Sequence, residues 1–187
     1  MGNQIRDGKG GGYLAEVDSK NRLRIYAVVE DKATWINRVE EEMYSGIFES
    51  TGIQAATGGN WVVYLKNTSA KFLVIVKLKH RCTGASGSLS YWLSPTGTPG
   101  GSLTTLTPSN RNAGSNRSAS VEMYQSTNIT GLSGGRRVGS LFGNDGEEFE
   151  FAQPCSGYIL PPDATLGIKA DNNTSTHFGG MSLYFRD

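Results

Sequence analysis

The apolar residues of this chain fall into short runs separated by turn-forming residues, a pattern typical of antiparallel strands. Residues 22–26 read Arg-Leu-Arg-Ile-Tyr, which alternates polar and apolar side chains at the two-residue repeat of a strand. Residues 61–65 and 72–78 are almost continuously apolar. Such runs predict central strands covered on both faces, with a second sheet and a neighbouring subunit as candidate covers. The polar residues 66–71 between them predict a turn, so we expect a hairpin.

Other segments with strand character are each bounded by Gly, Pro, Asn or Asp. Residues 40–44, Glu-Glu-Glu-Met-Tyr, are the one place where a short helix competes. The 25 glycines, with many Ser, Thr and Asn residues, supply tight turns and leave few good windows for helices. We therefore predict an all-β fold, a two-sheet antiparallel sandwich. The further strands are expected at residues 89–93, 120–124, 147–152, 158–160, 165–169 and 181–185.

The first twelve residues differ in composition from the rest of the chain. They are rich in glycine and polar residues and have little to bury, so we predict a flexible N-terminal arm over residues 1–12. The remaining residues, 13–187, are expected to form a single β-sandwich domain, because all-β domains reach this length. The chain has no apolar run of membrane-spanning length and no signal-peptide core at its N-terminus. We therefore expect neither a membrane-spanning nor a secreted protein.

Residues 94–118 form a long stretch of Thr, Gly, Pro, Ser and Asn, in which Leu103 and Leu106 are the large apolar side chains. Long loops in compact domains are often binding surfaces or contact arms. A solvated excursion without a function is the alternative. The sequence alone leaves both open.

Candidate chemistry is sparse. The formal net charge of +1, with Lys and Arg spread along the chain, gives no overall attraction to nucleic acid or acidic lipid. His80 lies two positions before Cys82 on a predicted strand, so a thiol–imidazole nucleophile is conceivable. It lacks an orienting third group and an oxyanion-hole motif. Cys82 and Cys155 have no partners at zinc-ligand spacing, and we expect buried free thiols.

The acidic residues and glycines support no enzyme class either. Residues 144–148 contain Asp-Gly, which we interpret as a turn and not as a calcium loop. The phosphate-binding loop, the dinucleotide-binding glycine pattern and the nucleophile elbow are not present in the sequence. We therefore expect no enzyme activity, no cofactor and no metal site.

Three segments resemble virion structural proteins of tailed bacteriophages. Residues 13–28 are similar to the start of those proteins, where a short segment with Val-Asp and Asn-Arg-Leu follows a flexible leader. Residues 61–76, an apolar strand, Lys-Asn, a polar turn and a second apolar strand, are also similar. So are residues 157–168, Gly-Tyr-Ile-Leu-Pro-Pro-Asp-Ala-Thr-Leu-Gly-Ile, whereas residues 94–140 carry no match.

The resemblance implies a jelly-roll-like sandwich, a homo-oligomer and specifically a trimer, bound outside the capsid lattice as a decoration or cement protein. The partner of this chain would be the major capsid protein. The chain would be made in the host cytoplasm and would reside on the outer capsid surface. A second hypothesis is a tail, fibre or baseplate component that binds host carbohydrate through its long loop. A third is a jelly-roll enzyme with a carboxylate pair in a cleft.

Aromatic and basic side chains are the candidate contacts with a partner. Aromatic residues serve either as interface anchors or as core residues, and Trp61 is assigned to the core. Arginines can pair with a partner's carboxylates. The candidate contacts are Arg6, Lys9, Trp35, Tyr44, Trp92, Arg111, Arg117, Arg136 and Arg137.

Overall fold

The computed structural model describes residues 15–17, 23–25, 43–50, 59–84, 86–146, 148–152, 157–170 and 176–186. The chain divides into two units, Met1–Trp35 and Ile36–Asp187. In the first unit, β1 (Ala15–Val17) pairs antiparallel with β2 (Leu23–Ile25). β2 lies within the strand expected at residues 22–26. The predicted arm over residues 1–12 lies outside the described residues, so that arm stays a prediction.

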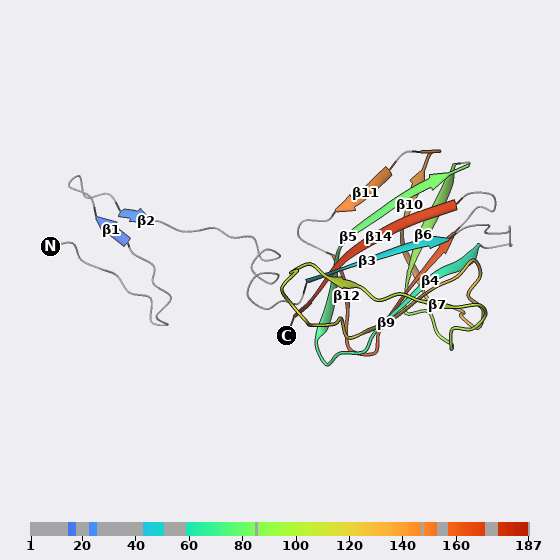
Figure 1. The fold of residues 1–187 in the computed structure, drawn as a ribbon, viewed down its shortest axis with the longest axis horizontal. Helices are drawn as coiled ribbons and strands as arrows, with labels where there is room; N and C mark the ends of the chain where they lie inside the picture. Colours follow the sequence, from blue (N-terminus) through green and yellow to red (C-terminus); the bar gives the residue numbers. More distant parts are fainter. Residues whose placement is uncertain are drawn as a thin grey trace. The chain divides into compact units, whose positions relative to one another are not determined.

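The second unit contains two antiparallel sheets (Figure 1). The β5 sheet has the strand order β11-β5-β14-β3-β8, and β12 also pairs with β5. The β4 sheet has the order β10-β6-β13-β4-β9-β7. The strands are β3 (Met43–Ser50), β4 (Asn60–Asn67), β5 (Phe72–Thr83), β6 (Gly87–Leu93), β7 (Thr104–Thr105), β8 (Ser109–Asn110), β9 (Val121–Gln125), β10 (Arg136–Gly143), β11 (Glu148–Ala152), β12 (Tyr158–Leu160), β13 (Thr165–Ala170) and β14 (Thr176–Arg186).

The strand order is that of a jelly roll. The chain alternates between the sheets from β3 through β6, runs from β10 to β11, and returns through β13 and β14. This leaves the four-stranded sets β11-β5-β14-β3 and β10-β6-β13-β4 facing each other, with shorter strands added at one edge of each. The predicted all-β, jelly-roll-like two-sheet sandwich is confirmed. Within the described ranges the structure has no helix that is both long and apolar enough to cross a membrane.

The predicted hairpin between residues 61–65 and 72–78 is wrong. These runs are β4 and β5, which lie in opposite sheets and do not pair with each other. The intervening turn crosses from one sheet to the other and is held by the buried side chain of Asn67, whose Nδ2 donates to the carbonyls of Lys71 (2.8 Å) and Leu160 (2.9 Å). A polar turn between two apolar runs fits a crossing as well as a hairpin, because both connections need only a solvated reversal.

The sandwich has one core between the sheets and a second apolar cluster outside β4. The core includes Leu65 of β4 and Ile75 of β5. Trp61 and Tyr64 of β4 instead pack with Ile129 on the outer side. They are three positions apart and share this side because the register with β13 shifts between Ile168 and Lys169. Leu103, Leu132, Trp92 and Tyr124 complete that cluster. The chain itself therefore covers both faces of β4, and the neighbouring subunit suggested as a cover is not needed there.

The long stretch at residues 94–118 is tied to both sheets. Thr96 bridges to Ser133 and Gly100 to Thr130, after which β7 pairs with β9 and β8 pairs with β3. Leu106 packs against the main core. The first part of this stretch is therefore anchored by backbone pairing and runs from the edge of one sheet to the edge of the other, although most of its side chains are exposed.

Two adjacent glycines of β14 give a direct test of this packing. A Cβ added at Gly179 would overlap the buried ring of Phe48, whereas one added at Gly180 would meet only the carbonyl oxygen of Gly46, at 3.6 Å. We expect Gly179→Ala to lower the free energy of unfolding by about 1–3 kcal/mol. Gly180→Ala should leave it unchanged or raise it by about 0.5 kcal/mol, because glycine weakens a strand interior. Urea denaturation measures both, and equal effects would contradict the packing described.

Candidate functional site

The outer face of the β5 sheet carries the candidate site. Side chains alternate between the two faces of a strand, and the buried residues Leu78, His80 and Cys82 of β5 point inward. The residues between them point outward, as do their register partners on β14 and β3. Three cross-strand rows result: Lys77, Ser182 and Ser45; Lys79, Gly180 and Ile47; and Arg81, Phe178 and Glu49.

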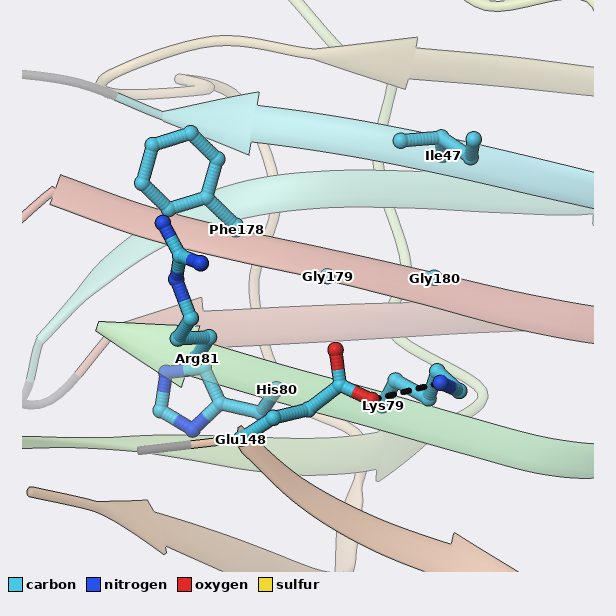
Figure 2. Close-up of a pocket in the computed structure, with 8 residues that line it drawn as sticks. All are labelled: Ile47, Lys79, His80, Arg81, Glu148, Phe178, Gly179 and Gly180. Atoms are coloured by element: carbon cyan, nitrogen blue, oxygen red, sulfur yellow. Dashed lines mark hydrogen bonds and ion pairs between the residues drawn. The ribbon is translucent and has the colours of Figure 1, made fainter. Parts of the chain in front are cut away.

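These rows form a trough along β14, which we call the β14 trough. Its floor is Gly180 and Ser182, the β5 cations form one wall, and Ile47 stands on the other with 77% of its surface exposed. Two shallow hollows of about 330 Å³ and 300 Å³ share Ile47, Lys79 and Gly180. Figure 2 shows the first hollow, where Gly179 and Gly180 leave the middle strand bare between the side chains of its neighbours.

The first hollow is framed by charged pairs. Lys79 Nζ lies 2.5 Å from Glu148 Oε1 of β11 (Figure 2). The hydrogen bond and the charge of Lys79 lower the pKa of the Glu148 carboxyl, with smaller contributions from Lys77 and Arg81. The guanidinium of Arg81 lies 5.2 Å from the centre of the Phe178 ring, a cation–π contact that covers the ring. This end of the trough is therefore partly neutralised by its own chain.

The second hollow has a different charge balance. Its described lining contains three cations, Lys77, Lys79 and Arg111, of which Lys79 also pairs with Glu148. The hydroxyl-bearing residues Ser45 and Ser182, which are cross-strand neighbours, also line it. Ammonium and guanidinium groups beside hydroxyl donors can bind a carboxylate or another oxyanion. This hollow is therefore suited to a negatively charged group.

Arg111 is held at the second hollow by β3. Its backbone N–H donates to the carbonyl of Met43 at 2.8 Å, and its Nη1 lies 3.7 Å from the sulfur of the same residue. The short pairing of β8 with β3 places the chain here. The residues after β8 thus bring a cation from the long 94–118 stretch to a face formed by β5, β14 and β3.

In the structure, His80 and Cys82 each contact a partner other than the one that a thiol–imidazole nucleophile would need. His80 Nε2 lies 2.9 Å from His177 Nδ1, and the two buried rings are stacked with centroids 5.2 Å apart. The thiol of Cys82 donates to the carbonyl of Gly143 at 3.0 Å, and burial raises the pKa of the thiol. The imidazole thus pairs with a second imidazole, and the protonated thiol is favoured, which is the less nucleophilic form.

The acidic turn also has a structural role. Asp145 Oδ1 accepts a hydrogen bond from the backbone N–H of Gly84 at 2.9 Å, and Gly146 adopts a positive φ of 78°. The turn interpretation of Asp145-Gly146 is confirmed. Among the described residues, no group of three or more His, Cys, Asp or Glu side chains is placed to hold a metal ion.

The predicted partner contacts are dispersed. Arg6, Lys9 and Trp35 lie outside the described residues. Tyr44 is buried in the core, edge-on to Phe185, so it takes the core role that the sequence left open for aromatic residues.

The remaining predicted contacts lie on different elements. Trp92 is half-buried on the outer side of the β4 sheet, with the ammonium of Lys169 4.9 Å from its ring centre. Arg117 is exposed in the long stretch, and Arg136 and Arg137 are exposed at the start of β10. Of the six predicted contacts that the structure describes, only Arg111 lines the trough.

Sequence reasoning missed the trough although a signal was present. In β5, Lys77, Lys79 and Arg81 alternate with Leu78, His80 and Cys82, which predicts one cationic and one buried face. The expectation that the whole run was covered on both faces hid this alternation. Comparisons with models of protein families, with curated proteins and with solved structures found no match.

The buried histidine pair predicts a loss of stability in mild acid. Burial, followed by the charge of His177, lowers the pKa of His80 from 6.5 to about 4, and a backbone hydrogen bond to Leu141 opposes the shift. The unfolded chain therefore takes up a proton below about pH 6.5 that the folded chain refuses until about pH 4. The stabilisation is fully present above this window and is lost as the pH falls through it.

We expect the free energy of unfolding to fall by about 2 kcal/mol between pH 7.5 and pH 5 from this group alone. Glu148 adds little there, because its pKa lies below its usual 4.5. Urea denaturation at both pH values measures the loss, and His80→Gln should remove most of it. An unchanged pH dependence in that variant would contradict the assignment to His80.

Proposed function

We propose that this chain is a non-enzymatic virion structural protein of the decoration type. It binds the outer capsid lattice through the major capsid protein and stabilises the lattice by bridging neighbouring capsomers. The observation that carries the proposal is the β14 trough, an open sheet face where a 77% exposed isoleucine stands opposite a row of cations. The jelly-roll-like sandwich and the sequence resemblance to tailed-phage virion proteins support it.

The proposed mechanism is selective binding to the assembled state. A protein that binds the lattice but not its separated subunits stabilises the lattice by mass action. Contacts that cross a boundary between capsomers must also break before the capsid opens. A trimer would present three copies of the trough, and simultaneous engagement would raise the overall affinity without any new kind of contact.

The carbohydrate-binding alternative gains no specific support. Ligand sites of that kind are usually lined by aromatic rings. Residues 94–118 contain no aromatic residue, and their first part is tied to the sheet edges. Of the two tryptophans in the outer cluster, Trp61 is only 6% exposed and Trp92 is half-buried.

Cryo-electron microscopy of purified virions of the phage that encodes the chain tests the proposal, with mass spectrometry to establish that the chain is in the particle. We expect density for the sandwich on the outer capsid lattice, at boundaries between capsomers. Density at the tail would replace decoration with tail structure or adsorption. Absence of the chain from the virion would overturn the proposal.

A further inference from the structure

We infer that the β14 trough binds an extended, carboxylate-bearing segment of a partner protein. A carboxylate of that segment occupies the hollow lined by Lys77, Lys79 and Arg111, and an apolar side chain of the segment packs on Ile47. The inference rests on the proposed function in one respect: the partner that supplies the segment is the capsid lattice protein.

Charge complementarity is the first argument for this occupant. The described lining of the second hollow has three cations, of which Lys79 also pairs with Glu148, and Ser45 and Ser182 add hydroxyl donors. A carboxylate is the protein side chain that such a set of donors fits, in paired hydrogen bonds with the guanidinium of Arg111 and in ion pairs with the ammonium groups.

The mixture of charges distinguishes a protein segment from a polyanion. Glu148 pairs with Lys79 beside the first hollow, and Glu49 is exposed at the Phe178 end of the rows. A phosphate chain that ran the length of the trough would approach both carboxylates. A polypeptide can place an acidic residue at one end and an apolar residue at the centre, which matches the order of groups along the trough.

The geometry of β5 fits an extended segment in particular. Lys77, Lys79 and Arg81 follow each other at every second position, so their Cα atoms recur at about 7 Å. Alternate side chains of an extended partner have the same repeat. The part of β14 from Phe178 to Ser182, which includes the floor, spans four residue steps, or roughly 13 Å, enough for a segment of about five residues.

Gly180 keeps the floor open although the fold does not require a glycine there. Its φ lies outside the left-handed region, and an added Cβ would meet only the carbonyl oxygen of Gly46, at an ordinary distance of 3.6 Å. The adjacent Gly179, in contrast, is required by the ring of Phe48. The lack of a side chain at Gly180 therefore preserves the hollow and not the packing of the sandwich.

The test is binding of the purified full chain to capsids that lack it, measured by co-sedimentation. Lys77→Glu reverses a charge in the second hollow, and Gly180→Glu places a carboxylate on the floor. We expect each to weaken capsid binding by about tenfold or more, because like charges oppose each other across an interface. The matched control is Lys66→Glu, a charge reversal on the outer side of the opposite sheet, which should bind within about twofold of the original chain. Thermal unfolding establishes that all three variants are folded.

Zero-length carbodiimide crosslinking of the same complex gives a second readout. The reagent joins a lysine amine to a carboxylate as an amide, and the water removed converts the carbodiimide into a urea. We expect Lys77 or Lys79 joined to an Asp or Glu of the capsid protein, with the internal Lys79–Glu148 amide as a positive control for the reaction.

The outcomes separate the two proposals. Capsid binding that is unaffected by Lys77→Glu and Gly180→Glu, with crosslinks from other lysines alone, would overturn the trough as the docking site and leave decoration standing. Failure of the original chain to bind capsids would overturn the decoration function and, with it, the capsid protein as the source of the segment.

Discussion

The pairing of β5 with β14 is the constraint on which the rest of the structure depends. Its register runs from Thr83 opposite Thr176 to Phe72 opposite Arg186, with one shift at Ser182/Leu183. A shift of one residue in a ladder would move every side chain to the other face. This register therefore decides both that His80 and Cys82 are buried and that Lys79 and Arg81 line an open face.

The outer faces of the two sheets differ in how far the chain covers them. The chain covers the outer side of β4 with its own residues, and Lys169 lies over both indole rings there, with its ammonium 4.5 Å from the Trp61 ring. Around Ile47, the β5 sheet remains exposed, with short or absent side chains on its middle strand. One face thus contributes to the stability of the domain, and the other is open to a partner.

Buried polar groups on the inner side of the β5 sheet link β5 to β14 and to β10. One ring nitrogen of His80 pairs with one ring nitrogen of His177 across β5 and β14, and the thiol of Cys82 donates to the β10 carbonyl of Gly143. An unpaired polar group in such a place would be costly, so these contacts specify how the strands meet. The same groups that suggested chemistry in the sequence therefore have a structural role.

The sequence by itself determined the all-β class and most long strands, because β-branched and aromatic runs bounded by turn residues have few other solutions. It did not reveal β10, where Gly139 and Gly143 interrupt the pattern. An added Cβ at Gly139 would lie 2.8 Å from the hydroxyl of Tyr158, and one at Gly143 would lie 3.0 Å from Cys82 Sγ. Close approach of distant segments thus favours residues that weaken the local strand signal.

The partner of each strand, and with it the candidate site, was decided only by the tertiary structure. A polar turn after β4 is compatible with a hairpin or with a crossing between sheets, and the crossing is favoured because it places apolar residues of β4 and β5 on opposite sides of one core. The β14 trough joins residues more than 130 positions apart, from Ile47 to Gly180, and no local pattern encodes that distance. Local sequence decides which side chains alternate; long-range pairing decides which of them meet.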